Sequence, residues 1–208
     1  MVSKSKQIIW ASFLILLLLG CASVKTKLPM DQNSAEPGSF VTFRGEQLKL
    51  IGTPVSVGKP LPSAKLVDAM TMKEVDLSQE RGSVLFLSIV VSIDTPVCEE
   101  QTHYLGREGK ELPKEIKRIT ISRDTPFAQK RFAKESKVTD IQYLSDYKEG
   151  DFGRATGLLI DKMMLLARSV ILVDKKGIVR YIQVVPEITR FPDMDRAFQK
   201  AIELSKEP

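Results

Sequence analysis

A nearly uninterrupted apolar run occupies residues 84–91, Val-Leu-Phe-Leu-Ser-Ile-Val-Val. It is rich in β-branched and large apolar residues without alternation, which is typical of a strand buried on both faces of a sheet. The pattern then changes to one that favours a helix reaching to about Gly109. Thr95 is a favourable N-cap, and Pro96 suits the first helical position, where a missing N–H costs nothing. The sequence therefore predicts a buried strand followed directly by a helix.

A second strand, turn and helix repeat this order. Residues 118–122 form the predicted strand, Asp124-Thr125-Pro126 the helix start, and residues 127–136 the helix. The other predicted elements are a hairpin of residues 40–43 and 47–50, short strands at 65–67 and 74–77, a short helix at 151–156 that ends at Gly157, a hairpin of 169–174 and 178–185, and a helix after Asp193. Their order predicts an α/β domain that resembles the thioredoxin-like fold: a mixed central sheet flanked by helices, with an extra N-terminal hairpin.

The N-terminus has the charge pattern of an export signal. Lys4 and Lys6 precede an apolar stretch from Ile8 to Leu19, which is too short to span a bilayer as a helix. The following Gly20-Cys21 resembles the lipobox of bacterial lipoproteins, in which the cysteine is lipidated before cleavage. We therefore expect a lipoprotein signal peptide at residues 1–20 and a lipid anchor on Cys21.

A lipid anchor on Cys21 would determine the domain organisation that follows it and the location of the protein. Residues 21–38 are polar, contain two prolines and lack periodicity, so they are expected to form a flexible tether to a domain at residues 39–208. The protein is expected in the bacterial cell envelope, attached to a membrane through the lipid, with its domain in the periplasm or on the outer side of the membrane.

The charge balance argues against a nucleic-acid partner. Loss of residues 1–20, which contain two lysines, lowers the formal net charge from +5 to +3. This excess is small and evenly spread, whereas nucleic-acid binding needs a concentrated basic surface. Lys25 and Lys27 directly follow the predicted anchor, where they could interact with anionic lipid head groups.

The chain has two cysteines and one histidine, which limits its chemistry. If Cys21 is acylated, Cys98 is the free thiol and no internal disulfide can form; if Cys21 is not acylated, it could pair with Cys98. His103 and a single thiol make neither a metal-ligand set nor a convincing Cys–His hydrolase. The glycines are too scattered for a phosphate-binding loop. We expect neither a metal nor an organic cofactor.

Cys98 lies in the first turn of the predicted helix, at the carboxyl end of the central strand. Backbone N–H groups and the helix dipole favour a thiolate at such a position. A thioredoxin-type C-x-x-C motif would need a cysteine where Thr95 stands, so disulfide exchange by that route is not available. The Thr95 hydroxyl could instead bond the thiolate and a peroxide oxygen together. Attack of Cys98 on a peroxide would give a sulfenic acid and water or an alcohol.

Several motifs resemble the thiol peroxidase (Tpx) branch of the bacterial peroxiredoxins, and the resemblance covers residues 40–205. These motifs are residues 41–45, 92–98, 120–132, 165–170 and 186–189. The resemblance implies that Cys98 is the peroxidatic cysteine, Thr95 its hydroxyl partner, and Arg168 the guanidinium that stabilises thiolate and peroxide. It also implies reduction of hydrogen peroxide and organic hydroperoxides at the expense of an external thiol, either a thioredoxin-like protein or a small thiol. Members of the family commonly form homodimers.

Two positions depart from the family pattern. Val91 replaces a proline that shapes the pocket, and Ala133 replaces the resolving cysteine. The second change removes the family's internal disulfide and predicts a one-cysteine peroxidase reduced by an external thiol. The alternative is a degenerate thioredoxin-fold lipoprotein that serves as a non-catalytic binding or envelope-assembly module.

Overall fold

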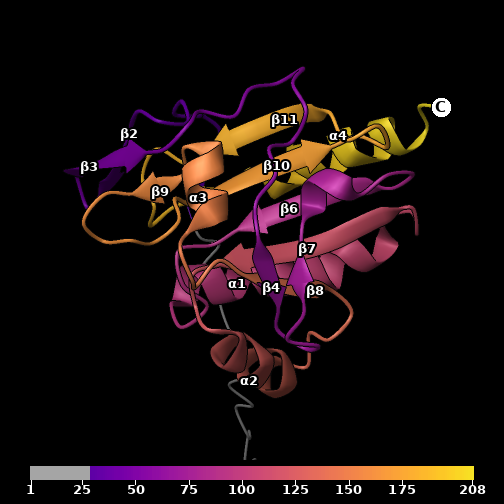
Figure 1. Ribbon diagram of the computed structural model, residues 1–208, viewed down its shortest axis with the longest axis horizontal. Helices are drawn as coiled ribbons and strands as arrows, with labels where there is room; N and C mark the ends of the chain where they lie inside the picture. Colours follow the sequence, from indigo (N-terminus) through magenta and orange to yellow (C-terminus); the bar gives the residue numbers. More distant parts are fainter. Residues whose placement is uncertain (1–28) are drawn as a thin grey trace, which may run out of the picture.

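A computed structural model describes residues 29–208 (Figure 1). Its centre is a seven-stranded mixed sheet in the order β11-β10-β6-β7-β8-β4-β5. The strands are β4 (Leu66–Asp68), β5 (Glu74–Val75), β6 (Val84–Ile89), β7 (Ile116–Ser122), β8 (Gln142–Ser145), β10 (Ser169–Val173) and β11 (Val179–Val184). A three-stranded sheet contains β2 (Phe40–Phe43), β3 (Glu46–Ile51) and β9 (Leu159–Ile160), and β1 (Met30–Asp31) pairs with β12 (Phe191–Pro192).

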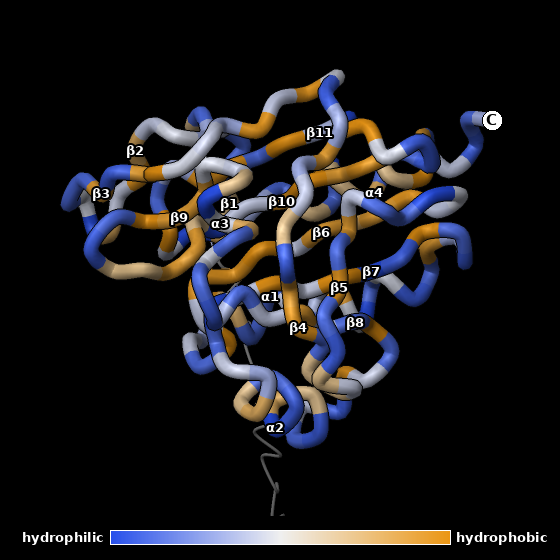
Figure 2. The backbone as a smooth tube through the Cα atoms, viewed as in Figure 1, coloured by the Kyte–Doolittle hydropathy of each residue, from blue (hydrophilic) through white to orange (hydrophobic). Residues whose placement is uncertain are grey.

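Strand β6 lies in the interior of the main sheet, between β10 and β7, because all six of its residues are apolar or small and can be buried on both faces. It pairs in parallel with β7 and antiparallel with β10, so that Leu87 lies opposite Ile119 on one side and Ile171 on the other. Figure 2 shows β6 and β10 as largely hydrophobic strands, whereas α2 at the periphery is largely hydrophilic.

The two faces of the sheet have separate hydrophobic cores. Helices α1 (Pro96–Arg107), α2 (Pro126–Ser136) and α4 (Met194–Ser205) contribute to one core, in which the rings of Phe86 and Phe198 lie 5.1 Å apart. Helix α3 (Asp151–Thr156) contributes Phe152 to the other core, together with Leu85 and Leu87 of β6. Successive residues of β6 therefore point to opposite cores, as strand geometry requires.

The predicted elements are largely confirmed. The buried strand at 84–91, the two helices that follow the Asp-Thr-Pro triplets, the N-terminal hairpin, the short helix ending at Gly157 and the C-terminal helix lie within a few residues of their expected bounds. Gly157 has a φ of +68°, which explains why a glycine ends α3. The sequence pattern missed β1, β8, β9 and β12. Three of these have only two residues, too few to show a period.

The expected flexible tether is wrong for residues 29–38, which lie against the domain. Strand β1 pairs in parallel with β12, and the Gln183 side chain donates a 2.7 Å hydrogen bond to the Asp31 carbonyl. Farther on, the Ala35 amide donates to the Val184 carbonyl at 2.8 Å. The Ala35 contact lies on the β11 edge of the main sheet, and the folded domain therefore includes residues 29–38, which were expected to belong to the tether. Cys21, the predicted signal peptide and the rest of the predicted tether lie outside the described residues.

No helix among residues 29–208 combines the length and apolar character needed to cross a bilayer.

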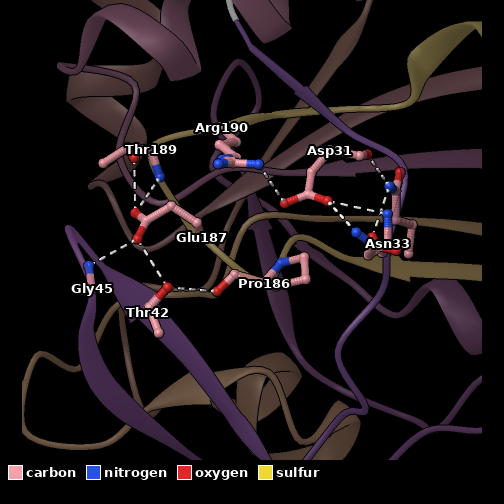
Figure 3. Close-up of polar contacts among 9 residues, drawn as sticks. Asp31, Asn33, Thr42, Gly45, Pro186, Glu187, Thr189 and Arg190 are labelled. Atoms are coloured by element: carbon pink, nitrogen blue, oxygen red, sulfur yellow. Dashed lines mark hydrogen bonds and ion pairs between the residues drawn. The ribbon is translucent and has the colours of Figure 1, made fainter.

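Glu187 links the N-terminal hairpin to the segment after β11 (Figure 3). Its carboxylate accepts hydrogen bonds from the Thr42 and Thr189 hydroxyls and from the backbone N–H groups of Arg44, Gly45 and Thr189, at 2.8–3.2 Å. Arg44 and Gly45 both have positive φ in the hairpin turn, which strains a residue such as arginine. Burial alone raises the pKa of Glu187, but these hydrogen bonds outweigh it and lower the pKa to about 2.

The low pKa of Glu187 predicts an acid-dependent contribution to stability. Its folded pKa lies below the value of 4.5 for an unperturbed glutamate, so the contribution is complete above about pH 4.5 and is lost as pH falls towards 2. The Glu187→Gln variant should lose about 1–3 kcal/mol at pH 7, because its amide cannot accept all these N–H and O–H groups. Urea unfolding of wild type and variant at several pH values measures this difference. The prediction fails if the difference does not shrink between pH 5 and pH 2.

Candidate active site

Cys98 lies in the first turn of α1, as predicted, and its side chain is fully buried. The sulfur accepts two hydrogen bonds: the Arg168 Nη2 donates from 3.2 Å, and the Ser92 backbone N–H donates from 3.5 Å. Ser92 belongs to the loop between β6 and α1, whereas Arg168 directly precedes β10. A guanidinium and an amide N–H together stabilise negative charge on the sulfur.

Arg168 is only 2% exposed, and all three nitrogens of its guanidinium have partners. Its Nε donates to the Ile188 carbonyl at 2.8 Å, and its Nη1 donates to the Gln101 Oε1 at 2.7 Å. The third nitrogen, Nη2, is thereby directed at the Cys98 sulfur. Burial of a charged group is costly unless it is bonded in this way. The structure thus brings together Cys98 and Arg168, which the sequence separates by 70 residues.

Gln101 is a site residue that the sequence analysis missed. It is fully buried on α1, three residues after Cys98 and therefore on the same side of the helix. While its Oε1 accepts from Arg168, its Nε2 donates to the Ser88 hydroxyl of β6 at 2.8 Å. Gln101 therefore fixes Arg168 relative to the central strand. The sequence signal that could have identified Gln101 is its position three residues after the cysteine, one helical turn away.

Thr95 is the N-cap of α1, as predicted, but its side chain makes no capping hydrogen bond. The hydroxyl donates instead to the Ser92 carbonyl at 3.1 Å. In the second Asp-Thr-Pro triplet, the Thr125 hydroxyl does cap its helix by accepting from the Ala128 N–H. The two triplets therefore start helices at similar positions but use their hydroxyl groups differently. A contact of Thr95 with a bound peroxide stays a prediction.

The two acidic residues that follow Cys98 on α1 are exposed to solvent. Glu99 and Glu100 expose 56% and 44% of their side chains, so their charges are screened by solvent. His103 pairs with Glu99 at 3.5 Å and lies beside the Phe132 ring. Val91 and Ala133 are both buried within the hydrophobic cores. Within residues 29–208, no cluster of three or more histidine, cysteine or acidic side chains could hold a metal ion.

A thioredoxin-like sheet that presents one cysteine sulfur to an arginine, at the start of a helix, defines an oxidoreductase of the peroxiredoxin type. The Redoxin family model matches residues 56–198. A thiol peroxidase from Staphylococcus saprophyticus is 37% identical over 159 residues, covering 76% of this chain and 95% of the relative. A thiol peroxidase from Bacillus subtilis is 35% identical over 166 residues, covering 80% and 98%.

Two solved structures are also similar. A peroxiredoxin-like protein from Aquifex aeolicus has a TM-score of 0.76 and 32% identity, covering 83% of this chain and 99% of that structure. A thiol peroxidase from Chromobacterium violaceum supports the fold, with a TM-score of 0.67 and 24% identity over 79% and 95%. The chain belongs to the redoxin family and, within it, to the thiol peroxidase branch of the peroxiredoxins.

Proposed function

We propose that this peroxidase reduces hydrogen peroxide and small organic hydroperoxides with a single redox-active cysteine. The observation that carries the proposal is the 3.2 Å hydrogen bond from Arg168 to the Cys98 sulfur. A non-catalytic module would have no need to bury a guanidinium against a thiol, because burial of an unused charge destabilises a fold. This geometry therefore favours the enzyme over the degenerate binding module.

The proposed reaction has two steps. The Cys98 thiolate attacks one peroxide oxygen, the O–O bond breaks, and the other oxygen leaves with a proton as water or an alcohol. The sulfur is now a sulfenic acid, oxidised by two electrons. Two equivalents of an external thiol then reduce it, which yields a disulfide of that thiol and water. Arg168 stabilises negative charge on the sulfur and on the leaving oxygen, and the Thr95 hydroxyl would orient the peroxide.

The one-cysteine route is supported by Ala133, which replaces the resolving cysteine of the family and is buried in α2. Cys98 is the free cysteine of the described chain. No second thiol within residues 29–208 is available to condense with the sulfenic acid.

Intact-mass analysis after one equivalent of hydrogen peroxide tests this route. We expect the mass of one added oxygen, which dimedone converts to an adduct on Cys98, and no loss of two protons from an internal disulfide. Turnover should continue only when dithiothreitol or a thioredoxin is supplied. A stable internal disulfide after oxidation would contradict the proposal.

We further propose that Cys21 carries a lipid and that the protein acts at a membrane of the cell envelope. The support is the charged-then-apolar order of residues 1–20 and the lipobox-like Gly20-Cys21. The same mass analysis, applied to protein extracted from native membranes, tests this proposal. Loss of residues 1–20 with an acylated Cys21 is expected. An N-terminus that retains the signal would contradict it.

A further inference from the structure

The second Asp-Thr-Pro triplet contacts the loop that precedes Cys98. Asp124 follows β7, and its carboxylate crosses to the neighbouring end of β6. Its Oδ1 accepts from the Ser92 hydroxyl at 2.8 Å, and its Oδ2 accepts from the Ile93 backbone N–H at 2.8 Å. One carboxylate therefore binds two successive residues of the loop.

Ser92 is the residue through which this contact reaches the site. Its backbone N–H donates to the Cys98 sulfur at 3.5 Å, and its carbonyl accepts from the Thr95 hydroxyl at 3.1 Å. The conformation of the Ser92 backbone therefore sets both one of the two donors to the sulfur, through its N–H, and the direction of the Thr95 hydroxyl, through its carbonyl. Asp124 holds the Ser92 side chain and also the Ile93 N–H, which belongs to the same peptide unit as the Ser92 carbonyl.

Asp124 is itself held firmly. Its backbone N–H donates to the Ser122 hydroxyl at 3.3 Å, and its carbonyl accepts from the Ser145 hydroxyl at the end of β8. The Ser122 hydroxyl also accepts from the buried Gln129 side chain of α2 at 2.9 Å. These bonds connect the carboxyl ends of β7 and β8 to α2, so the carboxylate is presented from a rigid part of the sheet.

We infer that Asp124 is a positioning residue for the peroxidase reaction: it holds the backbone of Ser92 so that the Ser92 N–H points at the Cys98 sulfur and the Ser92 carbonyl orients Thr95. The expected effect of Asp124 on peroxide reduction rests on the proposed function. The expected effect of Asp124 on thiolate formation does not depend on peroxide. A small displacement of a donor near the reacting atom can slow a reaction by orders of magnitude.

The chain supplies a matched control in the first triplet. Asp94 has the same Thr-Pro neighbours, but 63% of its side chain is exposed, and it pairs with Arg131 at 3.6 Å. The Asp124→Asn variant is the conservative change. Its side-chain oxygen can still accept from Ile93, and its amide nitrogen can donate to the Ser92 hydroxyl. Asp124→Ala removes both contacts and, like Asp124→Asn, removes the negative charge.

Two quantities are measured for wild type and each variant. One is the rate constant of Cys98 oxidation by hydrogen peroxide, and the other is the pH midpoint of thiolate formation, read from absorbance at 240 nm. Asp124→Ala should lower the rate constant by about 10- to 100-fold, and Asp94→Ala should leave it unchanged. Asp124→Asn should remain within about threefold of wild type, because it can keep both contacts that hold the Ser92 backbone. The thiolate midpoint of Asp124→Ala should lie about one pH unit above that of Asp124→Asn.

Equal midpoints in these two variants would overturn the inference, as would an unchanged rate in a folded Asp124→Ala protein. If Asp124→Ala does not fold, Ser92→Ala removes one of the two contacts and should lower the rate about three- to tenfold; an unchanged rate and midpoint would again overturn it. If wild type fails to react with peroxide but the midpoints differ as expected, the peroxidase proposal fails while the role of Asp124 stands.

Discussion

Replacing Cys98 with serine is expected to abolish enzymatic peroxide consumption. A serine hydroxyl is a weak nucleophile at neutral pH and forms no stable analogue of a sulfenic acid, so the rate should fall by at least about 10³-fold. Serine is similar in size to cysteine and can accept from the same Arg168 and Ser92 donors, so the variant should stay folded. Consumption of hydrogen peroxide in the presence of excess dithiothreitol measures the effect.

The background in this assay comes from side chains that react slowly with peroxide. The partly exposed methionines Met70, Met72, Met163 and Met164 are present in wild type and variant alike, so they contribute equally to both. Equal, slow consumption by the two proteins would show that Cys98 is not the reactive group. That result would favour the alternative hypothesis, a non-catalytic module with a thioredoxin-like fold.

Replacing Arg168 with lysine is expected to lower the rate constant by about 100-fold. A lysine keeps a positive charge, but its single nitrogen cannot serve the Cys98 sulfur, the Gln101 Oε1 and the Ile188 carbonyl in the geometry of the guanidinium. The acceptors left without a partner should lower the free energy of unfolding by about 1–3 kcal/mol. Stopped-flow oxidation and urea unfolding measure the two effects separately.

Arg180→Lys is the matched control for this substitution. Arg180 lies on β11 with 42% of its side chain exposed, and it pairs with Asp174 and Glu207 at 3.8 and 3.5 Å. Exposed ion pairs contribute little, so this variant should retain both the rate and the stability of wild type. A folded Arg168→Lys protein that reacts as fast as wild type would contradict the role of Arg168.

Much of the fold follows from local sequence patterns. The apolar run at residues 84–91 predicted a buried strand because only a strand covered on both faces needs so few polar residues. The two Asp-Thr-Pro triplets predicted helix starts because proline and threonine favour that position. The two-residue strands β1, β9 and β12 were not predictable, and neither was the docking of residues 29–38, which depends on distant partners such as Gln183.

The sequence by itself determined the atom that we propose as reactive: a cysteine in the first turn of a helix that follows a buried strand, recognisable from one continuous stretch. The resemblance of its motifs to those of thiol peroxidases added Arg168 to the proposed site. Only the tertiary structure decided how that sulfur is surrounded, because Gln101, Ser92 and Asp124 act through hydrogen bonds between α1, β6 and the end of β7. Such bonds depend on distances of a few tenths of an ångström between segments far apart in the chain, and no local pattern of residues encodes those distances.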